Sequence, residues 1–126
     1  MRKKSASDRY LLAIQTLKKQ YLCIRSVDVA RFLSVSKASV SAAMRQMKEQ
    51  GLVTVAPDGN LQFSAQGKRR INLLNRRVCF FQQKLFDAGV ASALALQDAL
   101  SFSWEMSEKS YNALRTLLED GASCHD

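Results

Sequence analysis

The sequence predicts a mainly α-helical fold that includes one short two-stranded hairpin. Three observations support this fold class. Apolar residues recur at the three-to-four-residue spacing of helices along most of the 126 residues. Residues 52–63 have a strand-like composition around a Pro-Asp-Gly-Asn turn. An apolar content of 47%, with only 5 glycines and 1 proline, is enough for a core and argues against a disordered or collagen-like chain.

The first helix is predicted to extend from about Ser7 to Leu22. Its apolar residues recur at helical spacing, and Asp8 in the first turn suits the helix dipole. The residues of this stripe are Tyr10, Ile14, Leu17 and Tyr21.

Two helices joined by a tight turn are predicted next. Val27–Leu33 has apolar residues on one face, and residues 34–36 interrupt that pattern. Ser36 is a suitable cap for a helix over Lys37–Gln50, which Gly51 ends. A short helix, a three-residue turn and a longer helix have the spacing of a helix-turn-helix.

A hairpin is predicted directly after these helices. The runs Leu52–Val55 and Leu61–Phe63 are joined through residues 57–60, which have strong turn chemistry. A hairpin in this place is a wing. The sequence therefore predicts a winged helix-turn-helix with three helices and a two-stranded wing.

The rest of the chain is predicted to be helical. A long helix over residues 65–86 has an apolar seam suited to packing against a partner helix or against the same chain, formed by Ile71, Leu74, Val78, Phe81 and Leu85. Two further helices are expected over residues 91–105 and from Ser107 to Gly121. We interpret this part as a helical dimerisation domain. The predicted domains are a winged helix over residues 1–66 and, over 67–126, the long linking helix with the dimerisation domain.

The net charge of +8 is unevenly distributed. Residues 1–86 contain 17 basic and 4 acidic side chains, a net charge of +13, whereas residues 87–126 contain 2 basic and 7 acidic side chains, a net charge of −5. A basic winged helix is what binding to the phosphates of double-stranded DNA requires.

The second helix of the helix-turn-helix is the expected DNA-reading helix. Its outward residues are short or basic, with no carboxylate before Glu49, which suits a helix that enters the major groove. The residues predicted to read bases are Ser36, Lys37, Ala38, Ser39, Ser41 and Ala42. Those predicted to contact the DNA backbone or to form the wing contact are Arg25, Arg45, Lys48, Asp58, Gly59 and Asn60. Lys68, Arg69 and Arg70 are further phosphate candidates.

Cysteine and histidine usage argues against an enzyme, a zinc ribbon or a disulfide framework. The cysteines are far apart and form no C-x-x-C pair, so we interpret Cys23 and Cys79 as core residues and Cys124 as a tail thiol in a reducing cytoplasm. The single histidine is His125, and no glycine-rich phosphate loop is present. No apolar run approaches the roughly 20 residues that cross a bilayer, so no membrane partner is expected.

The chain resembles the DtxR/MntR (diphtheria toxin repressor) family of metal-dependent repressors over residues 5–120. The motifs that carry the resemblance are Tyr10-Leu-x-x-Ile14, Ile24-Arg-x-x-Asp-Val-Ala30, Val35-Ser-x-x-Ser-Val-Ser41, Gly51-Leu-Val53, Ser64-x-x-Gly67 and Met106-Ser107. The resemblance implies a winged helix followed by a dimerisation domain, and repression of metal-uptake genes. We expect a homodimer on a pseudo-palindromic operator, because the two-fold symmetry of a dimer matches two half-sites on the DNA.

The chain departs from this family at the metal ligands. The positions at which the family places ligands carry Arg9, Leu12, Arg77, Leu100, Ser103 and Trp104. Because Mn and Fe bind carboxylates and imidazoles, whereas guanidinium groups repel a cation, we expect no metal and no cofactor at this site. A non-standard metal site that includes Asp8, Asp98 or Glu105 is the alternative.

Three interpretations of the two arginines stay open. In the first, Arg9 and Arg77 replace the metal ion of the family with fixed positive charge and pair with Asp98 or Glu105. In the second, the two arginines bind a small anion. In the third, the metal site is lost and both arginines are solvated. For the whole protein, the leading hypothesis is a homodimeric DNA-binding repressor that needs no metal. The alternatives are a metal-responsive repressor and a winged-helix protein-interaction module that binds no DNA.

Overall fold

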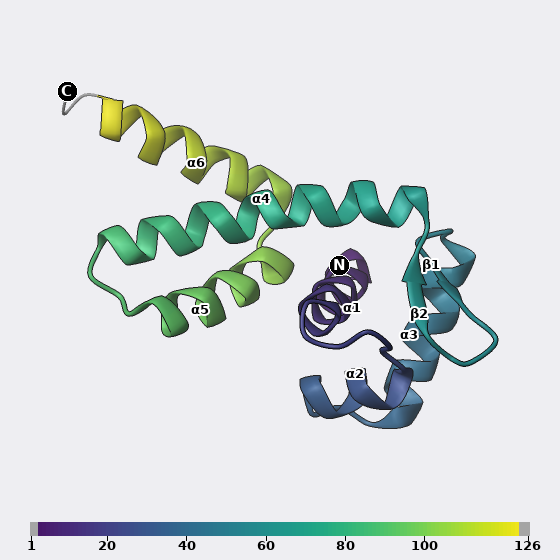
Figure 1. Ribbon diagram of the computed structural model, residues 1–126. Coiled ribbons are helices and arrows are strands. Elements are labelled where there is room, and N and C mark those ends of the chain that lie inside the picture. The colour runs from purple at the N-terminus through teal and green to yellow at the C-terminus, as the bar shows by residue number, and fades with distance from the viewer. Residues whose placement is uncertain (1–2, 124–126) are drawn as a thin grey trace. The chain divides into compact units, whose positions relative to one another are not determined.

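The computed structural model describes residues 3–123 and confirms a mainly helical fold with one antiparallel hairpin. The elements in these residues are α1 (Lys3–Lys18), α2 (Ser26–Leu33), α3 (Lys37–Glu49), β1 (Val53–Val55), β2 (Leu61–Phe63), α4 (Ala65–Asp87), α5 (Ser92–Glu105) and α6 (Glu108–Ser123) (Figure 1). The chain divides into two compact units, Met1–Leu74 and Asn75–Asp126, and α4 crosses the division. The domain boundary after residue 66 stays a prediction.

The first unit is a winged helix whose core lies between α1, α2, α3 and the hairpin. Leu11 and Ile14 of α1 are fully buried, as are Val40 and Met47 of α3. Leu61 of β2 closes this core. Burial of each such side chain contributes roughly 1.5–3 kcal/mol, so the apolar periodicity of the sequence and the packing of the helices agree.

A left-handed residue ends α2 and turns the chain into α3. Ser34 has a φ of 57°, and the amides of Ser34 and Val35 donate to the carbonyl oxygens of Arg31 and Ala30 at 3.3 and 3.0 Å. These bonds satisfy carbonyls that the end of a helix leaves open. The two helices and the turn of the predicted helix-turn-helix are therefore present.

The first helix ends at Lys18 rather than at Leu22, and the prediction that Tyr21 is buried was wrong. The amides of Gln20 and Tyr21 both donate to the carbonyl oxygen of Leu17 at 3.0 Å, which turns the chain. The carbonyl oxygen of Ile24 then accepts from the amide of Leu61 at 2.8 Å. Because this pairing with the wing draws the segment out of the helix, Tyr21 is 57% exposed.

Ser64 and Gly67 fix the start of α4. The hydroxyl of Ser64 accepts from the amide of Gly67 at 3.0 Å and donates to the carbonyl oxygen of Leu52 at 3.1 Å. A Cβ at Gly67 would overlap that same carbonyl oxygen, so the close approach of α4 to the base of the wing requires glycine.

The second unit packs the later part of α4 with α5 and α6. The ring of Phe81 on α4 lies edge-on to Phe102 of α5 and Tyr111 of α6, with centroids 5.3 and 5.8 Å apart. Most of the predicted seam of α4 is buried within the chain itself, namely Ile71, Leu74, Val78 and Phe81. Leu85 is half-buried. Packing within one chain therefore accounts for this seam.

Two further predictions were wrong in this part. The last helix continues through Gly121 to Ser123, since one glycine lowers helix stability by only about 1 kcal/mol. Cys79 is exposed, because it follows Val78 by one helical position and so leaves the buried seam. Cys23 is half-buried. The predictions for Cys124 and His125 lie outside the described residues. No helix within residues 3–123 is both long enough and apolar enough to span a bilayer.

Candidate nucleic-acid interface

Helix α3 presents a face of short and basic side chains to solvent. All six predicted base-reading residues are exposed: Ser36, Lys37, Ala38, Ser39, Ser41 and Ala42. Val40, Met44 and Met47 are buried, and this spacing places them on the opposite side of the helix. The apolar side therefore anchors α3 in the core and leaves the polar side open.

Two of the exposed hydroxyl groups also shape the start of α3. Ser36 Oγ accepts from the amide of Ser39 at 3.0 Å and lies 2.9 Å from Ser39 Oγ. An N-cap of this kind contributes about 1 kcal/mol to helix stability. Ser36 and Ser39 thus fix the geometry of the helix end that carries the other predicted base-reading residues.

Four exposed basic side chains follow the predicted base-reading residues in the sequence. Arg45 and Lys48 lie on α3, and Lys68 and Arg69 lie in the first turns of α4. Each is exposed, as contact with DNA phosphates requires.

The wing is held against the segment that precedes α2. Arg25 Nε donates to the carbonyl oxygen of Asp58 at 2.9 Å, and Asn60 Oδ1 accepts from the amide of Ile24 at 2.9 Å. Asp58 Oδ1 accepts from the amide of Asn60 at 2.9 Å, while Gly59 takes a φ of 89°. These predicted wing residues therefore maintain the shape of the wing, and Arg25 supports it from outside the hairpin.

Arg70 forms an ion pair that the sequence did not reveal. Its Nε and Nη2 donate to Asp8 Oδ1 and Oδ2 at 2.9 and 2.6 Å, which is the paired geometry that guanidinium favours. The Asp8 side chain is only 9% exposed. The two residues are 62 positions apart, so no local pattern could indicate the contact. Arg70, a phosphate candidate from sequence, instead joins α4 to α1.

Two of the six positions at which the family places metal ligands lie in the first unit, Arg9 and Leu12. Leu12 is buried in the core with 1% exposure. Arg9 is half-buried, and its Nη2 donates to the carbonyl oxygen of Leu33 at 3.5 Å.

The second unit holds the other four, and Arg77 is the most informative. It is 7% exposed, so the hypothesis that both arginines are solvated was wrong for this residue. Its Nη1 donates to the carbonyl oxygens of Ser103 and Met106 at 3.1 and 2.7 Å, and its guanidinium carbon lies 5.0 Å from the centre of the Tyr111 ring. Arg77 therefore stabilises the C-terminal end of α5.

The remaining three positions offer a cation at most one neutral oxygen, the hydroxyl of Ser103. Ser103 is fully buried and its hydroxyl donates to the carbonyl oxygen of Ala99 at 2.7 Å. Leu100 and Trp104 are half-buried. Because guanidinium groups, leucine and indole offer no lone pair to a divalent ion, these side chains do not fit Mn or Fe. Within residues 3–123, no three His, Cys, Asp or Glu side chains are grouped as metal ligands.

Comparison with known proteins agrees with this architecture. Residues 4–61 match the family described as iron dependent repressor, N-terminal DNA binding domain. The chain is 26% identical over 108 residues to the transcriptional regulator MntR of Escherichia coli O6:H1 and of O157:H7, which covers 86% of this chain and 70% of each relative.

A solved structure of a hypothetical protein from Sulfolobus solfataricus has the same fold. It superposes with a TM-score of 0.57 at 22% identity, and the match covers 88% of this chain and 85% of that protein. The family match over the winged helix and the similarity to MntR support a DNA-binding transcriptional regulator that is like the repressors of the DtxR/MntR family, whereas the solved structure shows the fold alone.

Proposed function

We propose that this protein is a sequence-specific repressor that binds double-stranded DNA through α3 and the wing. The observation that carries this proposal is the exposed face of α3, where short and basic side chains occur together while the other side is anchored in the core. A helix with small outward side chains fits closely into the major groove, where hydroxyl groups and alanine methyl groups contact base edges.

The residues divide between base contacts and backbone contacts. The base-reading set is Ser36, Lys37, Ala38, Ser39, Ser41 and Ala42. Arg45 and Lys48 contact flanking phosphates, and Arg25 with the wing residues Asp58, Gly59 and Asn60 contacts the groove edge. Phosphate contacts set the position of the helix, whereas base contacts give specificity.

A homodimer on a pseudo-palindromic operator is part of this proposal. Large apolar side chains of α5 and α6 are exposed in the single chain, among them Leu94 at 50%, Phe102 at 40% and Leu117 at 68%. Large exposed apolar side chains on two helices would be covered by a second copy of the chain in a dimer. The acidic charge of residues 87–126 also suits an interface that stays away from DNA.

DNA binding is proposed to need neither Mn nor Fe. The ligand positions carry side chains that do not fit a cation, and the carboxylate of Asp8 is already bonded to Arg70. The anion alternative has no support at Arg77, because its Nη1 donates to two carbonyl oxygens of its own unit. Both observations favour a regulator without the family's co-repressor.

The test is a DNA-binding titration in the presence and absence of metal. An operator is first selected from a random duplex pool in buffer that contains EDTA. Affinity for it is then measured with EDTA, with MnCl2 and with anaerobic FeSO4, at several salt concentrations. We expect affinities within twofold of one another and a steep dependence on salt.

Two outcomes would contradict the proposal in different ways. A tenfold loss of affinity on chelation, restored by Mn or Fe, would restore the metal-responsive alternative. Failure to select any duplex, with no salt-sensitive retention on random DNA, would favour a protein-interaction module; the polar face of α3 argues against that module.

A further inference from the structure

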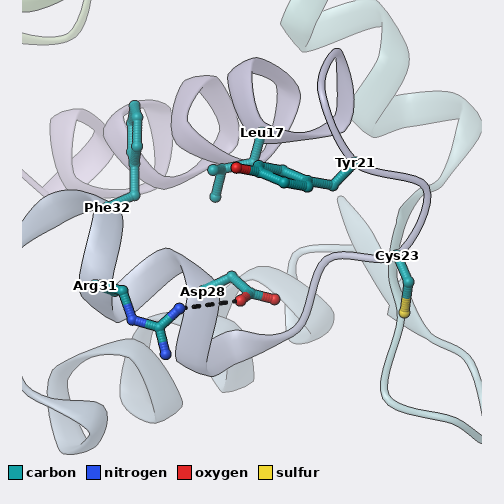
Figure 2. Close-up of a pocket in the computed structure, with 6 residues that line it drawn as sticks. All are labelled: Leu17, Tyr21, Cys23, Asp28, Arg31 and Phe32. Atoms are coloured by element: carbon teal, nitrogen blue, oxygen red, sulfur yellow. Dashed lines mark ion pairs between the residues drawn. The ribbon is translucent and has the colours of Figure 1, made fainter.

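A hollow lies where the end of α1 meets α2 in the first unit. It has a volume of about 320 Å³ and is lined by Leu17, Tyr21, Cys23, Asp28, Arg31 and Phe32 (Figure 2). Hollows of this size, with aromatic walls and few polar groups, are typical of sites for small molecules. None of the residues that line it belongs to the DNA-contact set proposed above.

Apolar side chains are unusually exposed around this hollow. Tyr21 is 57% exposed and Phe32 is 44% exposed, and the neighbouring Leu22 and Val27 are 99% and 38% exposed. Tyr21 and Phe32 both line the hollow, and large apolar side chains that are exposed together usually mark a binding site. The departure of Tyr21 from the predicted buried stripe of α1 is what opens this surface.

The hollow has an apolar side and a charged side. Figure 2 shows Leu17 and Tyr21 on one side and the Asp28–Arg31 ion pair facing them. Phe32 lies near Arg31 at one end, and Cys23 lies at the other. A ligand in this space would therefore contact aromatic carbon on one side and charge on the other.

The two charges differ in how firmly they are held. Asp28 Oδ2 accepts from the amide of Arg25 at 2.8 Å, so this carboxylate is bound to the N-terminus of α2. Its Oδ1 lies 3.6 Å from Arg31 Nη1, and the Arg31 side chain is 75% exposed. Because a guanidinium has five N–H donors and this ion pair is long, Arg31 has the capacity to bind a second anion.

We propose that this hollow binds a small organic anion with a flat apolar body. The body lies against Leu17, Tyr21 and Phe32, and its carboxylate or equivalent acid group pairs with Arg31. This site is separate from the DNA-contact residues, and the proposal does not depend on DNA binding.

The unmodified protein allows a direct test, because Cys23 lines the hollow and Cys79 is exposed elsewhere. The alkylation rates of both thiols by iodoacetamide are measured by peptide mass spectrometry, with increasing 2-naphthoate as the probe. We expect saturable slowing of the Cys23 reaction, at least fivefold, and no change at Cys79. The neutral 2-naphthamide should require about tenfold higher concentration for the same protection.

Variants then test the assigned contacts. Arg31→Gln should make 2-naphthoate protect no better than 2-naphthamide, and Phe32→Ala should weaken both probes. Arg115→Gln is the matched control, because Arg115 also forms an exposed intrahelical ion pair, with Glu119 at 3.3 Å, and it should leave protection unchanged. Thermal unfolding of each variant shows that the fold is retained.

Several results would overturn this proposal. One is the absence of saturable protection at Cys23, or equal protection of Cys23 and Cys79. Another is equal protection by the acid and the amide, or unchanged protection in Arg31→Gln. A shift to a smaller species on Leu22→Glu substitution, measured by sedimentation velocity, would assign the exposed surface to a second copy of the chain.

Discussion

Arg77 is a buried cation that stabilises a helix end. Its Nη1 donates to the carbonyl oxygens of Ser103 and Met106, at the C-terminus of α5. Carbonyls there lack intrahelical partners, and the helix dipole favours positive charge. An arginine at a position that resembles a family metal ligand therefore has a structural role in this chain.

Replacing Arg77 by Met should lower the free energy of unfolding by about 2–3 kcal/mol. Methionine keeps much of the apolar stem but removes the charged donor, which leaves buried carbonyl oxygens unsatisfied. Urea unfolding followed by circular dichroism measures the change. The matched control is Arg76→Met, at an exposed neighbour on α4, where the change should stay within about 0.5 kcal/mol. Equal effects at the two positions would show that Arg77 does not support α5.

The Asp8–Arg70 pair should be energetically coupled. Asp8 is nearly buried, so removing Arg70 leaves a carboxylate without its main partner, whereas removing both groups relieves that cost. A double-mutant cycle with Asp8→Ala and Arg70→Ala should give a coupling energy of about 1–2 kcal/mol in urea unfolding. MnCl2 should leave the stability of the wild-type protein unchanged. A coupling near zero, or stabilisation by Mn that Asp8→Ala abolishes, would contradict the structural role of this pair.

At the scale of elements, α3 and the wing serve different purposes in the proposed DNA complex. The wing is braced by Arg25 and Asn60, so its shape is set before DNA is bound. The face of α3 carries residues of two kinds, small groups near its start and Arg45 with Lys48 farther along. Substitutions of these two kinds should therefore differ in their effect on binding.

Ser41→Ala and Arg45→Gln should separate specificity from affinity. Ser41→Ala should relax the base preference at one position, by up to about 1–3 kcal/mol of discrimination, and leave the salt dependence unchanged. Arg45→Gln should weaken binding to all duplexes and reduce the slope of log affinity against log salt by about 0.9. Titrations against the selected operator and its point variants measure both. Arg115→Gln, which lies on α6, is the control; an equal loss of slope there would show that Arg45 contacts no phosphate.

At the scale of the molecule, the net charge and the exposed apolar side chains differ between the two parts of the sequence. The basic excess lies in residues 1–86, which include the whole winged helix, and the acidic excess lies in residues 87–126 with α5 and α6. Exposed leucines on α5 and α6 accompany the acidic part. This distribution suits DNA binding by the first unit and self-association by the second.

Leu117→Glu should weaken self-association at least tenfold. Leu117 is 68% exposed in the single chain, and a carboxylate buried at an interface carries a large desolvation cost. Sedimentation velocity over a concentration series measures the change, and affinity for a two-half-site operator should fall with it. Leu22→Glu, at a 99% exposed leucine of the first unit, should leave self-association unchanged. A wild-type protein that is monomeric at all concentrations would remove the basis of this prediction.

The sequence was most informative where the signal is local. The helix cap at Ser36 and the turn at residues 57–60 both follow from short-range patterns, and the structure contains each of them. The same is true of the outward residues of α3, which the burial of Val40, Met44 and Met47 leaves exposed. Two predictions of burial failed: Tyr21, which helical periodicity placed in the apolar stripe of the first helix, and Cys79, which cysteine usage alone assigned to the core.

The sequence by itself determined the order of the elements, the division of charge and the absence of metal-ligating side chains at the positions that resemble the family site. Only the tertiary structure decided what the charged residues do. Arg70 bonds Asp8, Arg77 bonds the end of α5, and Arg25 bonds the wing. The physical reason is that periodicity and capping act over a few residues, whereas the partner of a buried charge is set by which distant segments the packed core brings together.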